Sequence, residues 1–333
     1  MNVPLMTVIL PTYNRVDRLR RVIAALEQQA FPVTAFDVVV VSDGSSDGTA
    51  AYMATLQSPL ALQFVEQSNQ GAAAARNTGL QHATGTIVLF LDDDVVPSPT
   101  LLREHVDAHQ QDDLVVLGPM LSPPGFRMQP WVAWEQRMLV KQYDDMQQGR
   151  WTPTARQFYT GNSSVQRRWL LEAGGFDAGF RRAEDVELGY RLAARGLRFV
   201  FNANAIGWHF AERSFTAWLD TPYQYGRNDV IFTRDKAQHW LLPTLRVEFS
   251  ARHALIQLLV RACLDRPIIA APVVLLLRQA AHVAPLSSLA YSSLFNLRHY
   301  QGIADELGGR DAFFALGADT TAPRVPATDE RRT

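Results

Sequence analysis

The chain has 333 residues, 47% of them hydrophobic and 20% charged, which is enough apolar content for one large domain or two smaller ones. Its net charge is −1, so the chain as a whole has no electrostatic attraction to nucleic acid, and any anion must be held locally. The one cysteine, Cys263, excludes an intrachain disulfide framework, fits a reducing compartment and lies in an apolar stretch that predicts a core position.

The first 120 residues alternate apolar runs with segments of helical periodicity. Strands are predicted at residues 7–10, 37–41, 61–65, 86–91 and 114–117. Helices are predicted between them at residues 17–29, 47–56, 71–83 and 100–108. Strict alternation of strands and helices indicates a doubly wound, mostly parallel α/β sheet.

The rhythm changes after residue 120. Residues 120–160 carry prolines and aromatic residues without a clear period, and we interpret them as an active-site insertion. Regular patterns return at residues 166–173, 184–195, 198–201 and 205–208. From residue 215 to about residue 307 the pattern is helical and unusually apolar, and the final residues lack core-forming content.

Three aspartates, Asp92, Asp93 and Asp94, follow a wholly apolar strand. A buried strand cannot carry charge inward, so the three carboxylates emerge together at its C-terminal end, where open α/β sheets place their ligands. Clustered carboxylates repel one another unless a cation joins them, and hard oxygen ligands suit Mg²⁺ or Mn²⁺. An isolated acidic triplet is more often a solvated turn, but the neighbouring strand ends favour a binding site.

Polar residues also follow the other strands. The first strand ends in Pro11, Thr12, Tyr13 and Asn14. The ring of Tyr13 can lie against a nucleobase. The carboxylate of Asp43, at the tip of the second strand, can accept a base N–H, although such turns also serve as helix N-caps. Arg76 lies in a helix start rich in small residues and supplies a fixed positive donor.

These segments, in this order, resemble the nucleotide-binding half of the family 2 glycosyltransferases, which have the GT-A fold. The resemblance rests on residues 8–14, 41–49, 69–79 and 91–94, and it covers roughly residues 5–230. It implies that the nucleotide sugar is held by Pro11, Thr12, Tyr13, Asn14, Asp43, Arg76, Asp92 and Asp93. Among these, Asp93 would lie near the ribose. It also implies that Asp94 is the principal ligand of a Mn²⁺ or Mg²⁺ ion bridging the two phosphates.

Residues 174–177 and 181–190 resemble the acceptor-side segment of that family. Part of the second segment forms one apolar helix face, which we expect to be buried. Glu184 and Asp185 then occupy the first turn of the helix, where the helix dipole favours carboxylates. Such acids are also common without a catalytic role. The resemblance implies that Asp185, with Glu184 beside it, is the general base, acting opposite the leaving phosphate so that transfer inverts the anomeric centre.

The resemblance implies roles for two further residues. His209 follows the last predicted strand, where many GT-A enzymes place a histidine in the metal shell, although a lone histidine is more often structural. Asn162 matches a position near the donor sugar. Processive family members carry Gln-x-x-Arg-Trp, whereas here Gln224 and Arg227 are followed by Asn228, which favours transfer of one sugar per encounter.

The expected organisation is a GT-A catalytic domain over residues 1–215, with a nucleotide-binding part (1–120) and an acceptor-side part (121–215). A helical C-terminal region (216–310) and a disordered tail (311–333) follow. The C-terminal helices leave two alternatives open. They pack on the catalytic domain or on a second subunit as a homodimer, or they lie in a membrane interface where anionic headgroups meet Arg252, Arg261, Arg266 and Arg278. Membrane contact is slightly preferred. Because no secretory signal or spanning segment is expected, the predicted location is cytoplasmic, peripheral on the inner face of the membrane.

Other functions fit the sequence less well. A sugar-1-phosphate nucleotidyltransferase would want a glycine-rich loop after the first strand, and a dinucleotide dehydrogenase would need Gly-x-Gly-x-x-Gly there. A catalytically inactive nucleotide-sugar-binding module would be expected to lose the acidic triplet or the Glu-Asp pair. The expected function is therefore metal-dependent, inverting transfer from a nucleoside diphosphate sugar, with UDP favoured, to a glycan or lipid-linked hydroxyl in cell-envelope polysaccharide biosynthesis.

Overall fold

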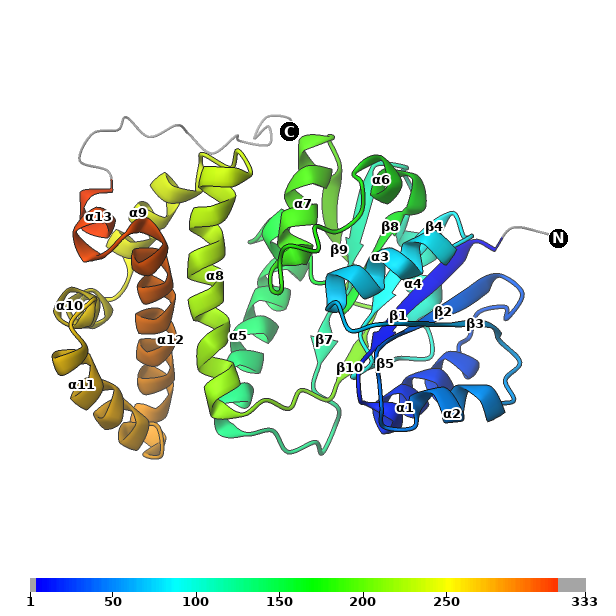
Figure 1. The fold of residues 1–333 in the computed structure, drawn as a ribbon, viewed down its shortest axis with the longest axis horizontal. Coiled ribbons are helices and arrows are strands. Elements are labelled where there is room, and N and C mark those ends of the chain that lie inside the picture. The colour runs from blue at the N-terminus through cyan, green and yellow to red at the C-terminus, as the bar shows by residue number, and fades with distance from the viewer. Residues whose placement is uncertain (1–3, 317–333) are drawn as a thin grey trace. The chain divides into compact units, whose positions relative to one another are not determined.

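The computed structural model describes residues 4–316 of the chain. These residues form two compact units. The N-terminal unit comprises residues 4–128 and 135–212, and the C-terminal unit comprises residues 129–134 and 213–316. A β-sheet flanked by helices makes up the first, whereas the second is helical (Figure 1).

The N-terminal unit is built on a seven-stranded sheet with the strand order β3-β2-β1-β4-β8-β6-β9. Its strands are β1 (Met6–Thr12), β2 (Phe36–Asp43), β3 (Ala61–Gln67), β4 (Ile87–Leu91), β6 (Leu114–Leu117), β8 (Asn162–Gln166) and β9 (Arg198–Phe201). Neighbouring strands are parallel except at β8, which runs antiparallel to both β4 and β6. The mostly parallel α/β sheet expected from the sequence is therefore confirmed. A small second sheet joins β5 (Val95–Pro97), β10 (Gly207–His209) and β7 (Met120–Leu121).

Helices cover both faces of the large sheet. They are α1 (Val16–Glu27), α2 (Thr49–Thr55), α3 (Ala72–His82), α4 (Leu101–Ala108), α5 (Pro130–Gln147), α6 (Arg167–Glu172) and α7 (Glu184–Ala194). Alternate residues of β1 face opposite sides, so Val8 and Leu10 pack with α1, α2 and α4, while Ile9 faces α3. A Cβ on Gly79 of α3 would overlap the side chain of Ile9, so glycine at this position lets α3 approach the sheet.

The C-terminal unit consists of α8 (Phe215–Asp235), α9 (Leu241–Ala251), α10 (Ala254–Cys263), α11 (Pro267–Ala280), α12 (Ala284–Leu307) and α13 (Arg310–Ala315), together with the first turn of α5. Two glycines allow close packing of α8 against α12. A Cβ on Gly226 would overlap the carbonyl oxygen of His299, and one on Gly302 would overlap that of Tyr223. Within residues 4–316, no helix is both long and apolar enough to cross a membrane.

Three expectations from the sequence need correction. The irregular insertion predicted at residues 120–160 contains the 18-residue helix α5, and strand β8 was not predicted. The disordered tail predicted from residue 311 is wrong for its first residues, because they belong to α13, whose Phe313 is fully buried against Phe249 and Tyr300. Residues 317–333 of that predicted tail lie outside the described part of the chain. Cys263 is buried in a hydrophobic core, as expected.

Candidate active site

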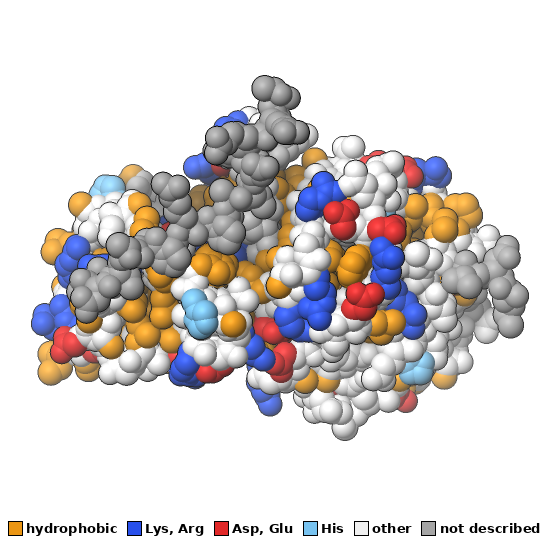
Figure 2. Space-filling model, turned by 90° about the horizontal axis from the view of Figure 1, so that it is seen from above, with side chains coloured by type: hydrophobic (Ala, Val, Ile, Leu, Met, Phe, Trp, Pro, Cys, Tyr) orange, Lys and Arg blue, Asp and Glu red, His pale blue; other side chains and the backbone are white. Residues whose placement is uncertain are grey.

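The carboxyl ends of four strands meet at one edge of the large sheet, because β1, β2, β3 and β4 are parallel. This edge collects Thr12 at the end of β1, Asp43 at the end of β2 and the three aspartates that follow β4. Figure 2 shows acidic and basic side chains intermingled over the N-terminal unit. The hydrogen bonds below show which of these charged groups act together.

Asp93 is the most deeply buried of the three aspartates, with 4% of its surface exposed. Its carboxylate accepts hydrogen bonds from the Thr12 hydroxyl at 2.8 Å and from the Arg15 guanidinium at 2.9 Å. Burial raises the pKa of Asp93 to about 6, although the positive charge of Arg15 opposes the shift. Thr12 and Asp93, both predicted as nucleotide-binding residues, are thus in direct contact.

Asp94 lies between two arginines and a histidine. Its Oδ2 atom accepts hydrogen bonds from Arg18 at 3.0 Å and from Arg15 at 3.4 Å. Its Oδ1 atom lies 3.6 Å from Nε2 of His209, because β10 pairs with β5 and so places His209 opposite Val95. The two residues predicted as metal ligands are therefore neighbours. Within residues 4–316, no three His, Cys, Asp or Glu side chains are grouped as a metal site.

The loops after β1 and β2 are tied together by hydrogen bonds. Asn14 adopts a left-handed backbone conformation, receives a hydrogen bond from the backbone N–H of Ser46 at 2.7 Å, and donates its own N–H to Ser45. Pro11 lies at the end of β1, and the ring of Tyr13 is half exposed. Asn14 thus has a structural role that the sequence did not indicate, while Tyr13 keeps an exposed ring face.

Asp43 is buried and orders the start of α3. One carboxylate oxygen accepts hydrogen bonds from Gln67 at 2.7 Å and from the backbone N–H of Gln70 at 2.9 Å, and the other accepts one from the N–H of Gly71 at 2.8 Å. A carboxylate oxygen can accept two hydrogen bonds. The oxygen facing Gly71 therefore keeps capacity for one more donor, such as a base N–H.

Arg76, near the start of α3, joins the two acidic segments of the site. Its guanidinium donates to Asp92 at 2.8 Å and to Glu184 at 2.7 Å. Burial by itself lowers the pKa of Arg76, but the adjacent carboxylates of Asp92 and Glu184 outweigh this effect and the net direction is upward. Arg76, predicted to hold the nucleobase, is paired in the structure with these two carboxylates.

Glu184 and Asp185 begin α7, as expected. The preceding residue, Ala183, has a left-handed conformation that turns the chain into the helix. Asp185 accepts hydrogen bonds from the backbone N–H groups of Val186, at 2.8 Å, and Thr160. Loss of hydration and the nearby charge of Glu184 raise the pKa of Asp185 to about 7, against the lowering effect of Arg76. A carboxyl group with such a pKa is suited to proton transfer near neutrality.

Asn162, predicted to lie near the donor sugar, is buried and hydrogen-bonded to backbone carbonyl groups. Only 1% of this residue is exposed, and its side-chain amide donates to the carbonyl oxygens of Pro119 and Ala205 at 3.0 and 2.7 Å. Its amide oxygen lies 2.9 Å from Nε2 of His105. Burial lowers the pKa of His105 to about 4 and so keeps it neutral. With these partners, Asn162 orders the interior beneath the site, and its side chain has no remaining donor for a sugar.

Arg15, Arg18 and Glu212 contact the predicted site residues and were not among the residues predicted from the sequence. Arg18 bridges Asp94 and Glu212, with a distance of 2.7 Å to the latter. The two arginines lie three residues apart around the first turn of α1, which follows directly on β1, so both reach the same acidic group. That spacing immediately after a strand end was the signal available in the sequence.

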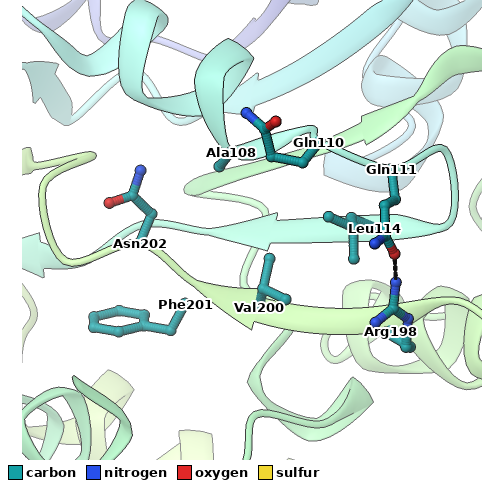
Figure 3. A pocket seen from close by; sticks show the side chains of 8 residues that line it. All are labelled: Ala108, Gln110, Gln111, Leu114, Arg198, Val200, Phe201 and Asn202. Carbon is teal, nitrogen blue, oxygen red and sulfur yellow. Dashed lines mark hydrogen bonds between the residues drawn. The ribbon is translucent and has the colours of Figure 1, made fainter. Parts of the chain in front are cut away.

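A separate surface pocket of about 370 Å³ lies at the edge of the large sheet (Figure 3). It is lined by Ala108, Gln110, Gln111, Leu114, Arg198, Val200, Phe201 and Asn202. Arg198 donates to Gln111 across its rim. None of the predicted site residues lines this pocket, so it is distinct from the polar cluster at the strand ends.

Comparisons with known proteins identify the family to which the chain is similar. Residues 7–181 match the family described as Glycosyl transferase family 2. Validoxylamine A glucosyltransferase of Streptomyces hygroscopicus subsp. jinggangensis is 31% identical over 233 residues, covering 62% of this chain and 55% of that protein. Glycosyltransferase AglE of Haloferax volcanii is 27% identical over 248 residues, covering 72% and 75%. The chain spans about half the length of the first of these relatives.

Among solved structures, the mannosyltransferase PcManGT of Pyrobaculum calidifontis, in complex with GDP-Man and Mn²⁺, aligns with a TM-score of 0.61. The alignment covers 92% of this chain and 89% of that one, at 21% sequence identity. At this identity the likeness concerns the fold.

Proposed function

Because the chain belongs to glycosyl transferase family 2 and has a GT-A-like fold, we propose that it transfers a sugar from a nucleoside diphosphate sugar to a hydroxyl group. The observation that carries the proposal is the contact of Arg76 with both Asp92 and Glu184. This contact joins the aspartates after β4 to the acids at the start of α7, so groups suited to the donor and to the acceptor lie side by side.

We propose UDP as the favoured donor nucleotide. The remaining acceptor capacity of Asp43 suits the ring N–H of uracil, and the half-exposed ring of Tyr13 offers a stacking surface for the base. Thr12 and Asp93 lie beside these groups, where a ribose hydroxyl can donate to the Asp93 carboxylate. Arg15 and Arg18 supply positive charge for the diphosphate.

Asp94 and His209 fit a divalent cation, because carboxylate oxygen and imidazole nitrogen are both ligands that Mn²⁺ accepts, and Mg²⁺ accepts the carboxylate. In the proposed complex these two residues hold the ion, which supplies charge neutralisation on the diphosphate leaving group. Arg18 is paired with both Asp94 and Glu212. Glu212 can therefore hold the Arg18 side chain when Asp94 binds the ion.

Asp185 is the proposed general base. The acceptor hydroxyl gives its proton to the Asp185 carboxylate while its oxygen bonds to the anomeric carbon and the bond to the diphosphate oxygen breaks. Glu184, fixed by Arg76, positions the first turn of α7 and maintains the negative field that keeps the pKa of Asp185 high. Single displacement of this kind inverts the anomeric centre, so an α-linked donor gives a β-linked product.

The acceptor is proposed to be a glycan or lipid-linked hydroxyl that receives one sugar per encounter. Asn228 supports this reading, since processive family members have tryptophan at the matching position. The relatives named above as glycosyltransferases support the reaction class.

The test is nucleotide release from UDP-glucose, UDP-N-acetylglucosamine and GDP-mannose in the presence of Mn²⁺. We expect release of UDP from at least one UDP-sugar, slower release of GDP from GDP-mannose, and no nucleotide release in excess chelator. A parallel reaction with UTP and a sugar 1-phosphate serves as the control. Release of pyrophosphate there, without UDP release from any nucleotide sugar, would replace the proposal with a nucleotidyltransferase.

A further inference from the structure

Helix α11 is apolar on all sides without being enclosed by protein. One side packs on the C-terminal unit through Ala270, Val273, Val274, Leu277 and Ala280. On the opposite side, Ile268, Leu275 and Leu276 are 90%, 58% and 69% exposed. No residue of this helix, all of which the structure describes, is fully buried. A helix that is hydrophobic all round is normally found in a protein core or in contact with lipid.

The exposed apolar surface continues into the next helix. Val283, the residue before α12, and Leu286 and Leu289 in the first turns of that helix are each more than 40% exposed. Together with Ile268, Leu275 and Leu276, these side chains are named here the apolar face. Exposed apolar surface of this extent marks an interaction site.

The charge around the apolar face is strongly positive. Residues 249–304 contain five arginines and one acidic residue, Asp265, in a chain whose net charge is −1. Arg266 precedes α11 and Arg278 lies in its last turn, and both are exposed. Asp265 accepts hydrogen bonds from Gln301 at 2.6 Å and from the backbone N–H of Arg310, so it is engaged within the unit.

We propose that the apolar face docks the C-terminal unit onto an anionic membrane surface, with α11 lying in the plane of the interface. The 14-residue helix is about 21 Å long, too short to cross a hydrocarbon core of about 30 Å. The apolar side chains enter the interface, and the arginines at both ends of the helix meet the headgroups.

Charge complementarity selects a membrane over a second copy of the chain. A two-fold interface through the apolar face would bring Arg266 and Arg278 of both copies around one apolar surface. The surrounding segment offers one carboxylate, Asp265, to neutralise them. An anionic bilayer presents many negatively charged headgroup phosphates to these arginines. This inference goes beyond sugar transfer and does not depend on the donor or on the metal.

The experiment is flotation of the full-length protein with vesicles of phosphatidylcholine containing or lacking 40% phosphatidylglycerol. We expect binding to anionic vesicles, at least about tenfold weaker binding to neutral ones, and weakening of the anionic binding by 0.5 M NaCl because salt screens exposed charges. The Ile268→Gln/Leu275→Gln/Leu276→Gln variant should lose about tenfold or more in affinity for anionic vesicles.

Two further variants make the result decisive. Leu171→Gln, which changes an exposed leucine of the N-terminal unit, should bind like the wild type. Arg266→Glu should weaken binding to anionic vesicles and leave the weaker binding to neutral vesicles unchanged, so the charge argument is tested without altering the apolar face. Melting temperatures within about 2 °C of wild type establish that the variants are folded.

Three outcomes would overturn the proposal. One is absence of vesicle binding by the wild type. Another is equal binding by the wild type and the triple variant. The third is a lipid-free wild-type dimer in sedimentation velocity that becomes monomeric in the triple variant, because the apolar face would then be a subunit interface. All three leave the nucleotide-release test untouched, so failure here is distinguishable from failure of the proposed enzymatic function.

Discussion

Replacing Arg76 with methionine tests whether one buried cation holds the two acidic segments together. The Arg76 side chain is 6% exposed, and breaking a buried ion pair by removing one partner costs about 3–5 kcal/mol. The Asp92 side chain is 36% exposed, so water compensates much of its loss, whereas that of Glu184 is 11% exposed and would remain charged and unpaired. We therefore expect the free energy of unfolding to fall by about 3 kcal/mol, near the lower end of that range. The corresponding fall in melting temperature is about 6–12 °C.

Arg168→Met is the matched control for this experiment. Arg168 pairs with Asp112 at 2.8 Å, the same distance that separates Arg76 from Asp92. In this control pair, however, the side chains of both partners are at least half exposed. Loss of this exposed ion pair should lower the free energy of unfolding by about 0–1 kcal/mol. Thermal melts of the two variants by circular dichroism give the comparison. If both variants showed equal, small decreases in melting temperature, the ion pairs of Arg76 would not hold the two acidic segments together.

The same variant changes the pH dependence of the reaction. The positive charge of Arg76 lowers the pKa of Asp185, so its removal should raise that pKa further. Because a general base acts when deprotonated, activity falls as the pH drops through this pKa. The acidic limb of kcat/KM should thus move to higher pH in Arg76→Met and stay in place in Arg168→Met. A shift to lower pH would contradict the assignment of Asp185.

Three other variants test separate parts of the account. Asp94→Ala should nearly abolish transfer and weaken Mn²⁺ binding, measured calorimetrically in the presence of UDP, while its melting temperature stays near that of the wild type. Full activity of the wild-type protein in excess chelator would contradict a role of Asp94 as metal ligand. Asp93→Asn should raise the Kd for UDP more than it lowers kcat, and the reverse pattern would remove Asp93 from the nucleotide site. Gly302→Ala should destabilise the C-terminal unit by about 1–3 kcal/mol, because its methyl group overlaps the carbonyl oxygen of Tyr223; an unchanged melting curve would show that α8 and α12 separate easily.

Hydrophobic patterning predicted the central strands well because the strands themselves are buried on both faces. Every residue of β4 is apolar and buried, so its position and the emergence of the aspartates after it follow from the sequence. Strand β8 has the sequence Asn-Ser-Ser-Val-Gln and carries no such signal. Its buried Ser164 is satisfied by His105 and His109, and these partners are more than 50 residues away in the chain.

The positions of the predicted site residues in their helices and strands follow from local sequence, whereas the contacts of their side chains across the fold do not. Glu184 and Asp185 follow from the periodicity of their own helix. The pairing of Arg76 with Glu184 joins residues 108 positions apart, and the contact of Arg18 with Asp94 joins residues 76 apart. The contacts of Asn162 could not be foreseen, because its orientation depends on the antiparallel pairing of β8, which the polar sequence of that strand did not reveal.

Turnover by Asp185→Asn at saturating nucleotide sugar, measured together with its Kd for UDP, tests whether Asp185 is the general base. This variant should lose ~10²–10⁴-fold in kcat and keep an unchanged Kd for UDP. Its melting temperature should stay near wild type, because the helix-dipole contribution of one charge is only ~0.3–1 kcal/mol. Glu184→Gln should lose less activity. Turnover by Asp185→Asn near the wild-type rate would contradict the account and place the base elsewhere.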